Sequence, residues 1–198
     1  MKKIIYAIIC LISCSLIGCE NINNEKTIST FNNKELKVYS AEDSQKVKDL
    51  LKSYGKSENL RVEKAKNNKI IVVDNEEIVG NKKIWNDFYN NSKNKKEGSV
   101  LIVQYTEQED PILTYLSYKD NKFFMIEDES RDQYRDSKEE DYFEYSFKYL
   151  KLFEENHKTY VYLLDDNKIT LDELNYSLLS SNISDWIPYG FVFYYTNS

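Results

Sequence analysis

The sequence predicts an α+β fold, a mainly antiparallel sheet with about three helices packed on one face, in a single domain. Short runs of β-branched and aromatic residues recur through the middle and end of the chain, which is typical of strands. Amphipathic segments of helical spacing lie between them. Only 5 Gly and 2 Pro interrupt the 198 residues, so no linker divides the apolar part of the chain into two domains.

Three segments are predicted as helices. The first begins at Ser40, with Asp43 three residues later as a variant of the capping box. The second spans residues 81–92 and places Ile84, Trp85, Phe88 and Tyr89 at helical spacing. The third begins at Thr170, where a glutamate three residues later completes a capping box. Each helix therefore has a start signal or an apolar stripe of its own.

Six further segments are predicted as strands because β-branched and aromatic residues dominate them and turn-forming residues bound them. The second, third and fourth of these follow one another closely enough to form a three-stranded meander. The predicted strands are 69–74, 99–106, 111–118, 122–127, 159–164 and 189–196.

Residues 142–153 fit two patterns. The aromatic residues Phe143, Tyr145 and Phe147 alternate with polar ones, as in a strand, whereas Phe143, Phe147 and Leu150 also fit a helix. Aromatic enrichment favours the strand.

Residues 1–18 are predicted to be a lipoprotein signal peptide. Two lysines precede an apolar stretch over residues 4–17, which is shorter than the roughly 20 residues of a membrane-spanning helix. Residues 16–19, LIGC, resemble the lipobox of bacterial lipoproteins. The resemblance implies cleavage between Gly18 and Cys19 and lipid attachment to the Cys19 thiol. An ordinary secretory signal or a short buried helix is the alternative.

This interpretation determines the organisation and location of the rest of the chain. Residues 19–35 are polar and rich in Asn, and they form a flexible tether from the lipidated Cys19, while residues 36–198 form the single folded domain. Cys10 and Cys14 leave with the signal, so no disulfide and no thiol chemistry are expected. The chain is then held at the cell membrane by lipid, on the extracytoplasmic face, with the bilayer as its first partner.

The formal net charge of −6 excludes a nucleic-acid binder, because phosphate contacts need a basic surface. The expected partner is an envelope protein, a peptide or a wall component. The single histidine, His157, is expected in a turn, and no catalytic residue and no metal ligand with a known motif is predicted. Trp186 and Tyr189 belong to the segment most expected to form an exposed aromatic patch.

Acidic residues gather in two predicted loops that leave the meander at the same end. They supply the candidate contacts for a ligand or ion: Glu107, Glu109, Asp110, Asp128 and Asp132. Calcium takes six to eight oxygen ligands, which makes it the candidate cofactor if the carboxylates converge. Two solvated acidic loops are the alternative, and an acid–base pair of a hydrolase is the least favoured.

The second of these loops has a structural interpretation as well. In the segment DESRD, residues 128–132, the Ser and Asp side chains can accept backbone hydrogen bonds, and Arg131 can bind a carboxylate. The segment then builds a turn.

The segments TEQEDPI, residues 106–112, and DESRDQY, residues 128–134, resemble an uncharacterised bacterial family, domain of unknown function 4362. Its members are mostly small lipoproteins or secreted proteins with yTxEgDPI and DxSRDxY segments. Glu109 stands where that family often has Gly. The resemblance covers residues 70–134 and implies a fold without implying an activity.

The sequence therefore predicts a membrane-anchored extracytoplasmic lipoprotein that acts as a binding or interaction module and is not an enzyme. The alternative is a calcium-binding envelope domain that uses the acidic loops, and an envelope hydrolase is the least favoured function.

Overall fold

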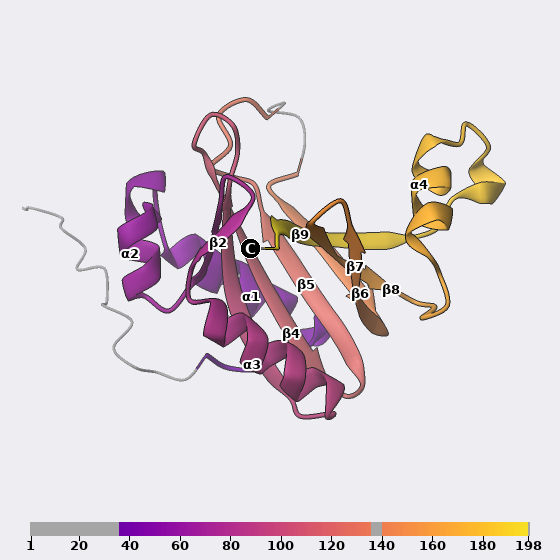
Figure 1. Cartoon of the computed structure of the whole chain (residues 1–198). Coiled ribbons are helices and arrows are strands. Elements are labelled where there is room, and N and C mark those ends of the chain that lie inside the picture. The colour runs from indigo at the N-terminus through magenta and orange to yellow at the C-terminus, as the bar shows by residue number, and fades with distance from the viewer. Residues whose placement is uncertain (1–35, 136–139, 198) are drawn as a thin grey trace, which may run out of the picture. The chain divides into compact units, whose positions relative to one another are not determined.

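A computed structural model describes residues 36–135 and 140–197 (Figure 1). The predicted signal peptide at 1–18, the tether at 19–35 and the lipid-attachment residue Cys19 lie outside the described residues. Among the residues that are described, no helix is both long enough and apolar enough to cross a membrane.

The described residues form an α+β fold, as predicted, with nine strands, four α-helices and three 3₁₀ turns. The helices are α1 (Ser44–Ser53), α2 (Val62–Asn67), α3 (Lys82–Lys93) and α4 (Leu171–Leu179), and the 3₁₀ turns are η1 (Ala41–Asp43), η2 (Ser57–Asn59) and η3 (Ile183–Asp185). The strands are β1 (Ile71–Asp74), β2 (Glu77–Gly80), β3 (Gly98–Tyr105), β4 (Pro111–Lys119), β5 (Lys122–Asp128), β6 (Tyr142–Phe147), β7 (Tyr149–Glu155), β8 (Lys158–Leu164) and β9 (Tyr189–Thr196).

The strands form two sheets rather than the one expected. The first sheet has six strands in the order β2-β1-β3-β4-β5-β6, and the second has three in the order β7-β8-β9. Neighbouring strands are antiparallel except β1 and β3, which are parallel. The predicted meander of β3, β4 and β5 is confirmed as the centre of the first sheet.

The prediction that the helices pack on one face of the sheet is wrong. Val72 of β1 packs with α1 and α2, whereas its neighbours Ile71 and Val73 pack with α3. Side chains alternate between the two faces of a strand, so this pattern puts α1 and α3 on opposite sides of the first sheet (Figure 1). The second sheet covers the remainder of the α3 side, where Val161 and Phe193 join the same core.

The first helix begins differently from the prediction. Ser40 makes no capping hydrogen bond through its side chain, and a 3₁₀ turn, η1, precedes α1. The carboxylate of Asp43, which was expected to complete the cap, does accept a hydrogen bond from the backbone of Ser40, and it also forms an ion pair with Lys46. At the other end, Gly55 follows the helix with a φ of +69°, the left-handed conformation that favours glycine after a helix.

Residues 142–153 are extended, as favoured, but they divide at Lys148 into β6 and β7 of different sheets. The alternation of core-facing side chains along the chain shifts by one residue at this point. Tyr145 and Phe147 face the main core from β6, whereas Leu150 and Leu152 face it from β7. Since odd-numbered residues face the core before the break and even-numbered ones after it, one straight strand cannot bury both sets.

The other predicted elements are confirmed within a residue or two at their ends. The capping box of α4 forms, because Thr170 Oγ1 accepts from the Glu173 amide while Glu173 accepts from the Thr170 amide. His157 lies in the turn between β7 and β8 with a φ of +64°. The sequence analysis missed α2 and β2, which are short and largely exposed.

Candidate functional site

The first acidic loop, residues 106–110, is a tight turn between β3 and β4. The amide of Glu109 donates to the Thr106 carbonyl over 3.0 Å, and the Thr106 hydroxyl accepts from the amide of Asp110 over 3.1 Å. Glu109 has a φ of +65°, a conformation that disfavours side chains other than glycine. The turn therefore forms although glutamate stands where the resembling family often has glycine.

Asp110 joins this loop to the second acidic segment. Its carboxylate is 4% exposed and accepts from the Gln133 amide and from Gln133 Nε2, each over 3.0 Å. The two predicted loops thus meet at the same end of the sheet, as expected. They meet through a carboxylate and an amide side chain, and both oxygens of Asp110 are used inside the fold.

Asp128 has a fully buried carboxylate at the end of β5. Oδ2 pairs with Arg131 Nη1 over 2.7 Å, and Oδ1 accepts from the amide and the hydroxyl of Ser130. Arg131 also donates to the carbonyls of Leu51 and Gly55 at the end of α1. Residues 128–132 therefore form a turn, as the structural interpretation of this segment predicted, and Arg131 attaches the turn to the end of α1.

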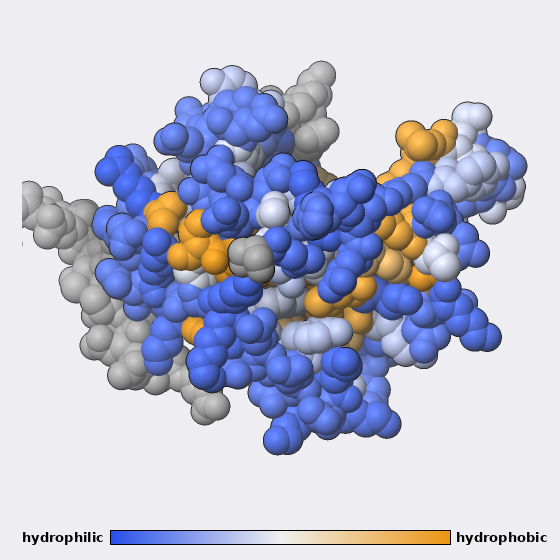
Figure 2. Space-filling model, viewed as in Figure 1, coloured by the Kyte–Doolittle hydropathy of each residue, from blue (hydrophilic) through white to orange (hydrophobic). Residues whose placement is uncertain are grey.

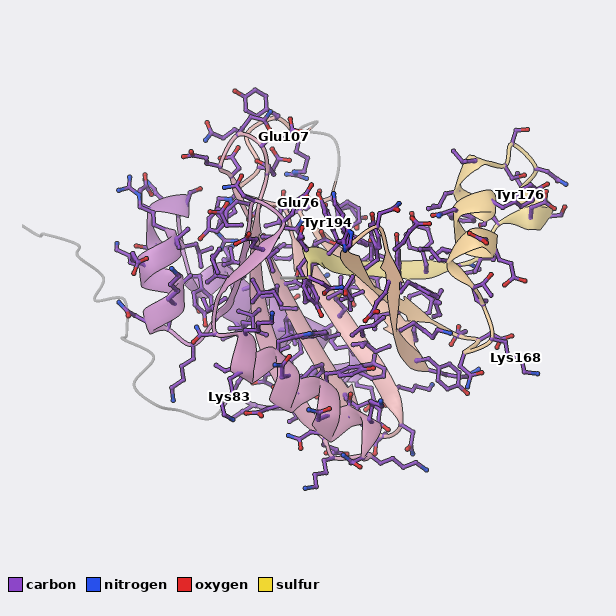
Figure 3. All side chains as sticks on the ribbon, in the orientation of Figure 1. Glu76, Lys83, Glu107, Lys168, Tyr176 and Tyr194 are labelled. Carbon is purple, nitrogen blue, oxygen red and sulfur yellow. The ribbon has the colours of Figure 1, made fainter. Side chains whose placement is uncertain are left out.

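The remaining predicted acids lie at the surface or serve the same turn. Asp132 Oδ1 accepts from the amide of Tyr134 over 2.9 Å, while Glu107 and Glu109 are exposed (Figure 3). Within residues 36–135 and 140–197, no three acidic, histidine or cysteine side chains are placed to hold a metal ion. Contact of these five acids with a ligand or ion stays a prediction.

A cleft of about 640 Å³ opens beside the first loop. The strands β1 and β3 are parallel, so their carboxyl ends lie at the same edge of the sheet. The cleft is at this edge. Asp74 and Glu107 line it together with Glu58, and Arg61 is the one basic side chain on its wall among the described residues. The sequence analysis missed Asp74 and Arg61, although the apolar run that ends at Asp74 marks the end of β1.

Comparison with known families identifies this part of the chain. Residues 66–162 match the family described as Domain of unknown function (DUF4362). This part of the chain is similar to that family. The match includes both segments on which the resemblance was based, and it extends from the end of α2 into β8. No curated protein and no solved structure matches the chain.

Beyond the DUF4362 match lies a second candidate region, the C-terminal lobe, which we define as residues 165–189 with α4 and η3. Of the eight large apolar side chains that are exposed among the described residues, five belong to this lobe. They are Tyr176 (66% exposed), Leu178 (42%), Leu179 (88%), Ile183 (87%) and Trp186 (63%). Figure 2 shows hydrophobic surface at the lobe, and Figure 3 shows Tyr176 on α4. The predicted exposure of Trp186 is confirmed, whereas Tyr189 is half-buried.

A shallow hollow of about 540 Å³ lies on the same lobe. Its apolar lining comes from Ile169, Tyr176 and Ile187. Four carboxylates and one lysine also line it, and they are Asp166, Asp172, Glu173, Asp185 and Lys168. The lobe therefore presents apolar side chains beside an acidic border.

Proposed function

We propose that this DUF4362 protein is a lipid-anchored, extracytoplasmic binding module without catalytic activity, which holds a basic, amphipathic segment of an envelope protein on its C-terminal lobe. The observation that carries the proposal is the group of exposed apolar side chains on α4 and η3, next to the acidic hollow.

Burial of these side chains supplies the affinity. Apolar surface removed from water contributes about 25 cal/mol per Å². Leu179 and Ile183 are more than four-fifths exposed, so nearly all of their area is free to be covered. Trp186 adds a rigid aromatic side chain of the type that dominates binding energy at interfaces. Exposed apolar side chains that are bordered by charged ones, as on this lobe, are typical of an interaction site.

The charge of the lobe selects the partner. Asp166, Asp172 and Asp185 face the hollow, and Lys168 is its single basic side chain. Complementary charge increases the rate of encounter and disfavours partners of the wrong sign. A segment with apolar residues on one face and Lys or Arg on the other matches both features of the lobe.

The anchor at Cys19 complements this role. A flexible tether of about 17 residues has a root-mean-square reach of roughly 20–25 Å. The negative charge of the protein repels an anionic bilayer within a Debye length. The domain therefore stands clear of the membrane, with its lobe accessible to other envelope proteins.

Site-specific photo-crosslinking tests the proposal in the intact anchored chain. A photoreactive residue at position 179 is expected to yield a defined adduct with an envelope protein that has a basic amphipathic segment. The same residue at position 83, an exposed lysine on α3, is the matched control and is expected to give none. Equal labelling from both positions, or labelling of lipid alone at position 179, contradicts the proposal.

The anchor is tested separately. Cys19→Ser is expected to leave an N-terminus that is neither cleaved nor acylated, whereas the wild-type chain begins at an acylated Cys19, as read by mass spectrometry. A wild-type chain without acyl groups on Cys19, or a variant that is still acylated and cleaved, contradicts lipid attachment.

A further inference from the structure

A second, smaller pocket of about 380 Å³ adjoins the C-terminal lobe. It lies between the β5–β6 edge of the first sheet and the start of β9 in the second. Aromatic and proline side chains make up most of its wall, with one carboxylate, and the lining residues are Glu127, Tyr145, Trp186, Pro188, Tyr189 and Phe191. The pocket is thus an aromatic enclosure around a single acid.

The pleat of β5 directs Glu127 into this pocket. Phe123 and Met125 share its face of the strand and belong to the core between the two sheets. Glu127 pairs in register with Phe143 of β6. In the part of the chain that the structure describes, no basic side chain pairs with this carboxylate and none donates a hydrogen bond to it. This distinguishes Glu127 from Asp110 and Asp128.

Burial among the aromatic side chains raises the pKa of Glu127 to about 7, and the nearby charge of Glu129 adds to the effect. The other titratable groups that face it are the hydroxyls of Tyr145 and Tyr189, on β6 and β9. The pocket therefore disfavours an isolated negative charge, and a cation placed beside Glu127 removes that penalty.

We propose that this pocket binds the ammonium group of a lysine side chain presented by the peptide segment on the lobe. The inference rests on the proposed function. An ammonium group is attracted both to the carboxylate and to the faces of aromatic rings. The alkyl stem of a lysine packs along apolar surface while its charged end reaches a polar partner. The compact ammonium has three donors, and the lining offers it the Glu127 carboxylate together with the hydroxyls of Tyr145 and Tyr189.

Trp186 connects the pocket with the lobe. It lines the pocket, is 63% exposed, and directly follows η3, which carries the exposed Ile183. A peptide that covers Ile183 therefore passes Trp186 and places a neighbouring side chain at the mouth of the pocket.

Titration of the full chain with Nα-acetyl-lysine N-methylamide tests the site, with fluorescence of the exposed Trp186 as the signal. We expect saturable binding, at least tenfold weaker binding of the Nε-acetylated compound, and at least tenfold weaker binding to Glu127→Gln. Glu107→Gln, which removes an exposed acid outside the pocket, is the matched control and is expected to bind as the wild type does. Choline serves as the probe for a quaternary headgroup.

Three results overturn the lysine site: equal binding of the acetylated compound, unchanged binding to a folded Glu127→Gln, or preference for choline. The lobe variant Ile183→Asp, with the photoreactive residue kept at position 179, separates the two proposals. It is expected to lose the crosslinked partner while it still binds the lysine amide. If the lysine amide fails to bind and the adduct at position 179 persists, the pocket inference fails and the proposed function stands.

Discussion

The acidic loops of the DUF4362 segment and the C-terminal lobe both concentrate carboxylates, but they use them in opposite ways. Asp110 and Asp128 are buried and their oxygens are taken by Gln133, Ser130 and Arg131. In the lobe, the carboxylates border exposed apolar side chains. Buried acids hold loops together, whereas the lobe acids lie at the surface. Asp166, Glu173 and Asp185 also accept hydrogen bonds inside the lobe, but their negative charge stays next to uncovered apolar side chains, where a partner can reach it. The two motifs that resemble the family thus contain, in this chain, residues that stabilise the fold.

The largest effect is expected in the loops. Arg131→Ala leaves the buried Asp128 carboxylate without its counter-ion and removes one donor each from the carbonyl of Leu51 in α1 and from that of Gly55, which follows the helix. Breaking such a pair costs about 3–5 kcal/mol. Urea unfolding followed by circular dichroism measures the loss, and Lys83→Ala, at an exposed pair, is expected to change stability by less than about 0.5 kcal/mol. A loss below about 1 kcal/mol for Arg131→Ala contradicts the structural role.

Glu127 gives an effect of intermediate size that depends on pH. Its pKa is raised from 4.5 to about 7 in the folded state, so between these values the folded chain holds a proton that the unfolded chain has released. Stability therefore falls as the pH rises through this range, and Glu127→Gln removes the fall. The variant is expected to gain on the order of 2 kcal/mol relative to wild type at pH 8 and nothing at pH 4. Thermal unfolding at several pH values measures this, and parallel curves for the two proteins disprove it.

The lobe is expected to show the converse of the Arg131 result. Ile183→Asp changes a side chain that contacts solvent and leaves position 179 for the photoreactive residue, so the free energy of unfolding is expected to stay within about 0.5 kcal/mol of wild type. The yield of the crosslinked adduct is expected to fall at least tenfold, because the covered apolar area is lost. A large loss of stability in the variant, or an unchanged yield of the adduct, contradicts the view that the lobe serves binding while the loops serve stability.

The smallest effect concerns the turn at Glu109. Its φ of +65° strains any residue with a side chain, so Glu109→Gly is expected to stabilise the protein by about 0.5–1 kcal/mol. The glycine also adds freedom to the unfolded chain, which limits the gain. Glu107→Gly, two residues earlier in the same loop, is expected to bring no gain in stability and serves as the control. Equal changes for the two variants contradict a strained backbone at Glu109.

Local signals were enough to predict most elements. The capping box of α4 and the apolar stripe of α3 depend on neighbouring residues, and both helices form where expected. The faces that these helices cover were not predictable in the same way. Strands such as β3 carry apolar residues on both sides, so their sequence does not say which helix takes which face.

The candidate sites depend on contacts between distant segments, which explains what was missed. The loop acids were identified from their sequence clustering, but the hydrogen bond between Gln133 and Asp110 spans 23 residues of chain, and the one from Arg131 to Leu51 spans 80. The pocket at Glu127 forms only when β9 packs against β5 and β6. Trp186 was found from its sequence because it and Tyr189 lie within one segment of four residues, 186–189, which is a local signal.

The break at Lys148 has a thermodynamic consequence. A small sheet is stable when its hydrophobic face is packed. Here β7 continues the same run of chain as β6, and Phe147 and Leu150 share one core on either side of the break. Melting β7 would expose part of the six-stranded sheet as well. The smaller sheet is therefore expected to open together with the larger one in hydrogen exchange, as a single cooperative unit, and this gives α4 a rigid base.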